Sequence, residues 1–181
     1  MALEEKNKKK FSILMPAFIA STLALILSVI SIILYASNCA SEFNANTVSP
    51  NVIGLSIAGI IFAFLAFCGG FAGLLLKKSE KVSYIVMLSR IFNYAAFILL
   101  LGSFMFQILD EYQLLGTIFY AMLNAGHGDP VDPVLAGSYW ASLIMSLVAC
   151  ILSLVAGILV RIKSHKVIPE IKVEKEEPVH E

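Results

Sequence analysis

Residues 52–76 read VIGLSIAGIIFAFLAFCGGFAGLLL, twenty-five residues without a charged side chain. A helix needs about 20 apolar residues to cross a hydrocarbon core roughly 30 Å thick. This stretch is therefore long enough to span a bilayer. Three further windows, 12–35, 84–109 and 137–160, have the same apolar character, and Arg90 is the one charged residue within them.

The composition agrees with these four windows. Of 181 residues, 59% are hydrophobic and 14% are charged, whereas a soluble domain carries about 25% charged residues. We therefore predict an all-α polytopic membrane protein whose single domain, 12–162, is a four-helix transmembrane bundle. The first window is too long to be the apolar core of a signal peptide, which spans about 7–15 residues.

Two polar tails flank this domain. Residues 1–11 form the N-terminal tail. Residues 163–181 mix Lys and Glu with two prolines and contain no aromatic residue, a composition typical of disordered segments.

The basic residues predict the orientation. All thirteen Lys and Arg residues lie before the first window, after the fourth, or around the connection between the second and third, and none lies in the other two connections. Under the positive-inside rule both termini are cytoplasmic, and we expect the plasma membrane as the location. The residues closest to the windows, read as topology determinants that also face lipid headgroups, are Lys77, Lys78, Lys81, Arg90, Arg161 and Lys163.

Small residues recur at helical spacing in the second and fourth windows. In lipid, helices associate where small residues let their backbones approach, so these positions predict packing surfaces, either within the bundle or against another protein. They are Gly54, Ala58, Gly69, Gly70, Gly73, Ser142, Ser146, Ser153 and Gly157. Pro16, close to the start of the first window, predicts an entry bend there.

The connection between the third and fourth windows holds most of the distinctive sequence. Apolar residues recur at helical spacing between 110 and 125, which predicts an extracytoplasmic amphipathic helix. It either packs over the end of the bundle or presents a partner surface, for which the candidates are Leu115, Ile118, Phe119, Met122, Tyr139 and Trp140.

The sequence contains little that indicates catalysis. His127, Asp129 and Asp132 are the one cluster with metal-ligand chemistry, and in a Gly/Pro-rich segment such residues more often form solvated turns. We therefore predict no catalytic residue, no metal and no cofactor, and the chain is not expected to be an enzyme. Arg90 is expected to extend towards the headgroups, or else to pair near Asn93.

These observations favour a non-catalytic tetraspan protein that serves as an assembly, scaffold or accessory subunit. Its expected partners are the lipid bilayer and either further copies of itself or a larger membrane complex, with no nucleic acid. A transporter or channel component is the alternative. The topology resembles that of claudin-like and tetraspanin-like proteins, but the cysteine motifs of their outer loops are absent, so no family is assigned.

Overall fold

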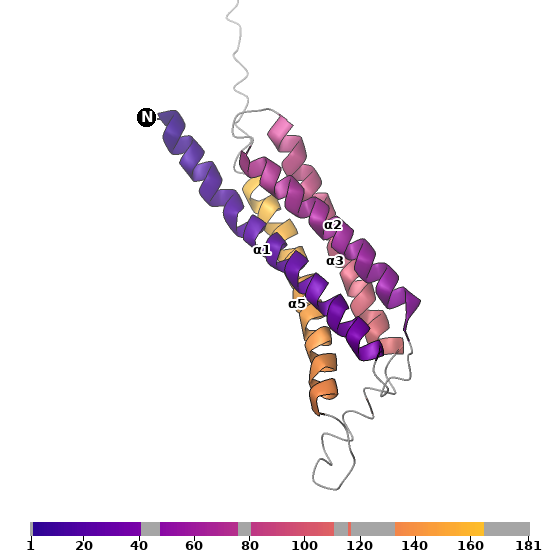
Figure 1. Ribbon diagram of the computed structural model, residues 1–181. Helices are drawn as coiled ribbons and strands as arrows, with labels where there is room; N and C mark the ends of the chain where they lie inside the picture. The colour runs from indigo at the N-terminus through magenta and orange to yellow at the C-terminus, as the bar shows by residue number, and fades with distance from the viewer. Residues whose placement is uncertain (1, 41–47, 76–80, 111–115, 117–132, 165–181) are drawn as a thin grey trace, which may run out of the picture.

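The computed structural model describes residues 2–40, 48–75, 81–110, 116 and 133–164, and describes side chains for 14–40, 48–75, 84–110, 116 and 137–160. These residues form four long helices, drawn in Figure 1. Helix α1 runs from Ala2–Cys39, α2 from Pro50–Leu75, α3 from Lys81–Asp110 and α5 from Pro133–Ser164. The amphipathic helix predicted between 110 and 125 lies outside the described residues, except for Asp110, the last residue of α3, and Gly116.

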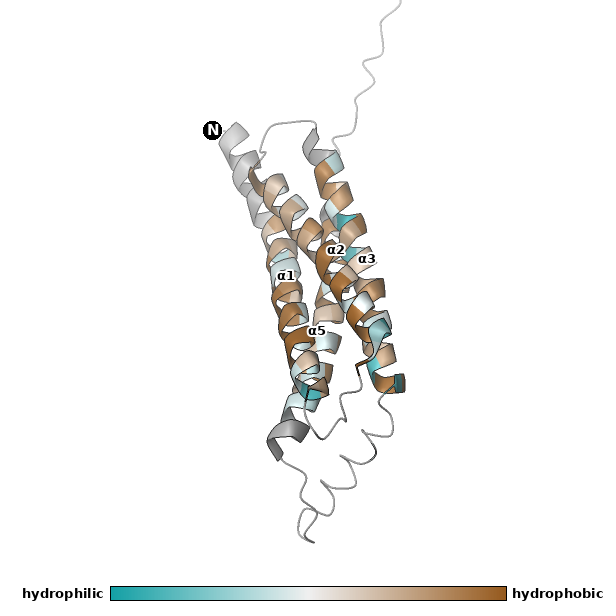
Figure 2. Ribbon diagram, turned by 45° about the vertical axis from the view of Figure 1, so that its right-hand side comes forward, coloured by the Kyte–Doolittle hydropathy of each residue, from teal (hydrophilic) through white to brown (hydrophobic). Residues whose placement is uncertain are grey.

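Each helix contains a stretch long and apolar enough to cross a membrane. These stretches are Leu14–Cys39, Pro50–Leu75, Tyr84–Asp110 and Gly137–Val160. Their apolar character is visible in Figure 2, where hydrophobic residues colour most of the four ribbons. The prediction of an all-α, four-helix transmembrane bundle is confirmed.

The helices pack in a ring, in which each helix lies beside two others. Helix α1 contacts α2 and α5, and α3 contacts α2 and α5; the contacts between α2 and α3 and between α1 and α5 are the most extensive. The start of α1 and the end of α5 lie at the same end of the bundle (Figure 1). We call this the basic end, because the basic residues of the sequence flank it. We call the opposite end, where α3 ends at Asp110, the acidic end.

Two prolines have different positions in their helices. Pro50 is the first residue of α2, where its fixed φ suits a helix start, and Ser49 before it accepts a hydrogen bond at its side-chain oxygen from the Val52 amide (3.5 Å). Pro16 lies well inside α1, because α1 begins at Ala2 rather than at the start of the apolar window. Pro16 therefore does not mark an entry into the helix.

Glycines set the closest approaches between neighbouring helices. An added Cβ at Gly59 would lie 2.8 Å from the Leu100 side chain, and one at Gly157 would lie 2.8 Å from the Tyr94 ring. A Cβ at Gly69 would come within 2.9 Å of Ser89. In lipid, such close backbone approach supplies the van der Waals contact that holds helices together.

Aromatic rings fill the contact between α1 and α2 near the basic end. Phe18 of α1 stacks on Phe67 of α2 at a centroid distance of 5.3 Å, and lies 6.2 Å from Phe71. A Cβ on Gly70 would lie 3.4 Å from the Phe18 ring. Gly70 thus lets the ring rest against the α2 backbone.

Two glycines on α2 allow a direct test of this packing. Gly59→Ile should lower the stability of the bundle by about 1–3 kcal/mol, because the new side chain must displace the buried Leu100. Gly54→Ile should leave the stability of a single bundle nearly unchanged, because no atom of another described helix lies within 4 Å of a Cβ there. Thermal unfolding of both variants in detergent measures the difference, and equal effects would contradict the glycine contacts.

Candidate functional site

Three helices meet at Ser142 near the acidic end. The hydroxyl of Ser142 on α5 donates to the carbonyl of Ser31 on α1 (3.1 Å), and the hydroxyl of Ser31 donates back to the carbonyl of Ser142 (3.0 Å). Gln107 on α3 donates from Nε2 to the Ser142 hydroxyl (3.0 Å). All three side chains are buried. This Ser142 junction joins α1, α3 and α5 by reciprocal hydrogen bonds.

A second polar contact joins α2 and α3. The Ser103 hydroxyl donates to the carbonyl of Val52 (3.1 Å) and lies 2.6 Å from the Ser56 hydroxyl, which therefore donates to it. Closer to the acidic end, the backbone amide of Ser49 donates to the Tyr35 hydroxyl (3.1 Å), and the Ser49 hydroxyl donates to Asp110. Every helix is thus tied to a neighbour by a side-chain hydrogen bond in this half.

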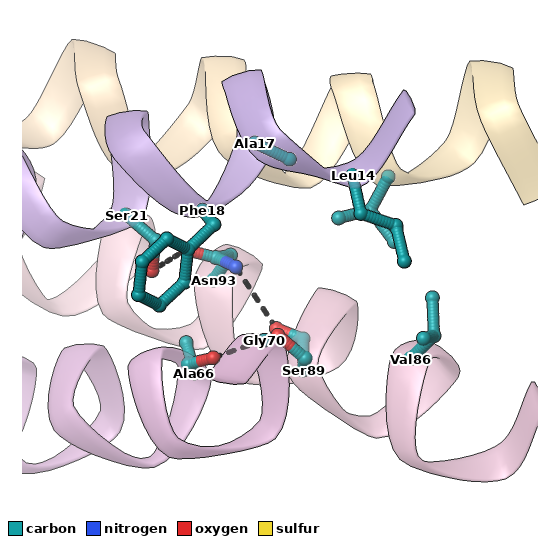
Figure 3. Close-up of a pocket in the computed structure, with 10 residues that line it drawn as sticks. Leu14, Ala17, Phe18, Ser21, Ala66, Gly70, Val86, Ser89 and Asn93 are labelled. Carbon is teal, nitrogen blue, oxygen red and sulfur yellow. Dashed lines mark hydrogen bonds between the residues drawn. The ribbon is translucent and has the colours of Figure 1, made fainter. Parts of the chain in front are cut away.

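A third polar cluster lies towards the basic end. Ser21 on α1 donates to Oδ1 of Asn93 (3.2 Å), Asn93 donates from Nδ2 to the carbonyl of Ser89 (3.0 Å), and the Ser89 hydroxyl donates to the carbonyl of Ala66 on α2 (2.8 Å). Figure 3 shows these bonds beside a cavity of about 20 Å³. That volume is enough for one water molecule, which needs about 10–15 Å³.

An apolar layer separates these polar clusters. Leu100, Ala149 and Cys150 are buried together in the middle of the bundle. Leu27, Phe97 and Leu101 pack against them. Buried serines also lie near this level, Ser28 on α1 and Ser146 and Ser153 on α5. The middle of the described interior is therefore less polar than its two ends, although it contains hydroxyl groups.

Arg90 has an aromatic partner. Its guanidinium carbon lies 5.6 Å from the centroid of the Tyr94 ring, one turn further along α3. A cation over an aromatic face contributes about 0.5–2 kcal/mol. The pairing expected near Asn93 is not what the structure contains, because Asn93 turns inward to Ser21 and Ser89. Helical i, i+4 spacing is the signal that could have identified Tyr94.

The predicted packing residues separate into two groups. Gly69, Gly70, Gly73 and Gly157 approach other helices, and Ser142, Ser146 and Ser153 are buried on α5. Gly54 is exposed and Ala58 is partly exposed, so both lie towards the outside of α2. The hydroxyl oxygen of Ser153 is buried without a hydrogen-bond partner among the described residues.

Gly54 and Ala58 belong to a continuous strip on the outer face of α2. Its members follow i, i+4, i+7 spacing, which places them on one side of a helix, and each is exposed or partly exposed. We call it the α2 outer strip: Gly54, Ala58, Ile61, Leu65, Cys68, Ala72 and Leu75. It contains two small-residue pairs, Gly54 with Ala58 and Cys68 with Ala72, at the four-residue spacing that allows helices to approach in lipid.

The candidate partner surface is only partly described. Leu115, Ile118, Phe119 and Met122 lie outside the described residues, as do His127, Asp129 and Asp132. Tyr139 is buried, with 2% of its surface exposed, and Trp140 beside it is partly buried. Tyr139 shares the inward face of α5 with Ser142, Leu143 and Ser146 at helical spacing, so it does not offer an open surface.

Three of the six basic residues named as topology determinants lie at helix ends, whereas Arg90 lies inside α3. Lys81 is the first residue of α3, and Arg161 and Lys163 lie in the last turn of α5. Lys77 and Lys78 lie outside the described residues. Within the described part of the chain, no three His, Cys, Asp or Glu residues are grouped so that they could hold a metal ion.

The cysteines do not link the described helices to one another. Cys39 is buried against Tyr35 and Val52, Cys150 is buried in the apolar layer, and Cys68 is exposed. Cys39 is the one cysteine in the outer connections of the sequence, which leaves two interpretations, a free thiol or a link to a second chain. Burial of its side chain does not favour that link.

The fold and these contacts define an integral membrane protein of four helices with a hydrogen-bonded interior. Comparison with known protein families, curated proteins and solved structures finds no significant match.

The Ser142 junction can be tested by removing one hydroxyl. Ser142→Ala removes the bond to the Ser31 carbonyl and the acceptor for Gln107. Hydrogen bonds between membrane helices average about 0.6 kcal/mol and reach about 1.7, so a loss of about 1–2 kcal/mol is expected. Ser37→Ala on the exposed face of α1 is the matched control. Unfolding in mixed micelles measures both, and a neutral Ser142→Ala would argue against the junction.

Proposed function

We propose that this protein is a non-catalytic assembly or accessory subunit of a membrane complex, which associates with further copies of itself or with another membrane protein through the α2 outer strip. The observation that carries the proposal is the position of Gly54. The other glycines of α2 support contacts inside the chain, whereas Gly54 lies on a lipid-facing strip with Ala58 one turn away. A GxxxA pair in this position favours a second helix at close range.

The interior of the bundle favours a role in assembly over a role in solute transport. Transporters commonly place charged or polar groups at the bilayer midplane beside broken helices. In the described part of this chain the middle holds the apolar layer around Leu100, and the cavity beside Asn93 has room for about one water molecule. These features favour the assembly role over the alternative of solute transport.

Cys68 provides a natural probe of the α2 outer strip. Under mild oxidation in native membranes, a second copy docked on this strip should form a disulfide-linked dimer through Cys68, which is exposed. If the partner is a different protein, a bifunctional crosslinker attached to the Cys68 thiol is needed to capture it. Gly54→Leu should reduce the crosslinked fraction several-fold, because the larger side chain keeps the second backbone away.

Two controls make this experiment decisive. Cys68→Ser should abolish the product, since Cys39 and Cys150 are buried. A cysteine placed at Ile98 on the exposed face of α3, in the Cys68→Ser background, reports random collision. Equal crosslinking from positions 68 and 98, or no product with any partner at position 68, would refute the proposal.

We further propose that the membrane is the plasma membrane and that both termini are cytoplasmic. The distribution of the thirteen basic residues supports this orientation. A fluorescent protein fused to the C-terminus should fluoresce in a bacterial host, and alkaline phosphatase fused there should be inactive. Active phosphatase at the C-terminus would reverse the orientation.

A further inference from the structure

A groove of about 690 Å³ runs between α1 and α5 on the outside of the bundle. Its volume falls within the range of roughly 300–1,000 Å³ that is usual for small-ligand sites. Ala20 forms its floor with 7% of its surface exposed, and Ile19 and Leu23 stand beside it with nearly half of theirs exposed. The remaining lining residues, Met15, Pro16, Leu152, Val155 and Leu159, are also apolar.

The lining favours a flexible chain over a second helix. Helices dock in lipid where pairs of small residues lie one turn apart, and Ala20 is the one small side chain in this groove. Ile, Leu, Val and Met elsewhere in the lining would hold a second backbone at a distance. An acyl chain has no such requirement, because it can follow the irregular surface between the side chains.

The groove leads towards positive charge on both helices. On α1, positions 8 and 9 precede Met15 and Pro16 by seven residues, which is two helical turns, and both are lysine. On α5, position 163 follows Leu159 by four residues and is also lysine. Glu4 and Glu5 lie a further turn beyond the lysines on α1. Beyond the basic end of the groove, the first charged positions on both helices are therefore basic.

We propose that the α1–α5 groove binds an anionic phospholipid, with one acyl chain against Ala20 and Leu23 and the phosphate headgroup at the level of Lys8, Lys9 and Lys163. Each lysine near a membrane surface strengthens the attraction to anionic lipid by about fivefold in affinity. The apolar groove adds a fixed position for the chain of the same molecule. This site lies between α1 and α5 and does not depend on the proposed assembly through α2.

The test places a tryptophan reporter in the groove of the full-length chain. Leu23→Trp lies nine residues into its span from the basic end, and Ile91→Trp on the exposed face of α3, seven residues from the same end and outside the α2 outer strip, is the control. Each variant is reconstituted in vesicles that contain increasing amounts of phosphatidylglycerol with brominated acyl chains, or of phosphatidylcholine with the same chains. The parent chain, with Trp140 alone, supplies the background fluorescence.

A groove site predicts that brominated phosphatidylglycerol quenches Leu23→Trp at a mole fraction at least about fivefold lower than brominated phosphatidylcholine does, because one lysine alone contributes about fivefold and three lie at this end. Ile91→Trp should distinguish the two lipids by several-fold less than Leu23→Trp does, because Ile91 does not line the α1–α5 groove. Neutralising Lys8, Lys9 and Lys163 together to Gln should remove the preference at Leu23→Trp. Ala20→Phe, which fills the floor of the groove, should weaken quenching by both lipids.

Three results would overturn the proposal. Equal quenching of Leu23→Trp by both lipids would show that the groove does not select an anionic headgroup. The same preference at Ile91→Trp would show general enrichment of anionic lipid around the protein. Protection of Leu23→Trp from both lipids would show that another protein segment, such as a second copy, covers the groove.

Discussion

Lipid gives helices no hydrophobic reason to associate, because the acyl chains are as apolar as the side chains that they contact. The bundle therefore depends on a few contacts of another kind, and the hydrogen bonds at Ser142 are the clearest of these. One hydroxyl donates to α1 and accepts from α3 while it belongs to α5. Glycine contacts at Gly59, Gly69 and Gly157 then allow the remaining surfaces to come together.

The distribution of polar groups follows from this dependence. Most bonds between helices lie towards the two ends of the described interior, and in the layer around Leu100 the thiol of Cys150 donates to the Phe97 carbonyl (3.8 Å). Most of the polar side chains that reach this interior satisfy one another or a backbone carbonyl on the next helix. Such an interior gives a bundle one defined packing arrangement. It is suited to a protein that presents fixed outer faces to its surroundings.

The sequence was sufficient to predict the number and type of helices, because a charge-free run of about 20 residues is long enough to span a bilayer and too apolar to face water. It could not assign the faces of those helices. Gly54 and Gly59 both belong to the same small-residue pattern, yet one is exposed and the other approaches Leu100. The two glycines are five residues apart, and only the placement of α3 shows which of them faces inward.

Pairings between helices were equally beyond reach. Asn93 lies on α3, but it accepts a hydrogen bond from Ser21 on α1, which is 72 residues away in the sequence. Tyr139 was expected at a surface, because Tyr and Trp commonly mark the membrane interface. It is buried instead, because it shares the inward face of α5 with Ser142. Hydropathy reports depth along a helix and carries little information about rotation around it.

The ring of Tyr94 touches two parts of the molecule that otherwise have nothing in common. Its edge limits how closely α3 and α5 approach at Gly157, and its face supports the guanidinium of Arg90. The spacing of two helices and the depth of a positive charge are thus set by the same side chain. A substitution at Tyr94 therefore changes the contact between α3 and α5 at Gly157 and removes the aromatic partner of Arg90 at the same time.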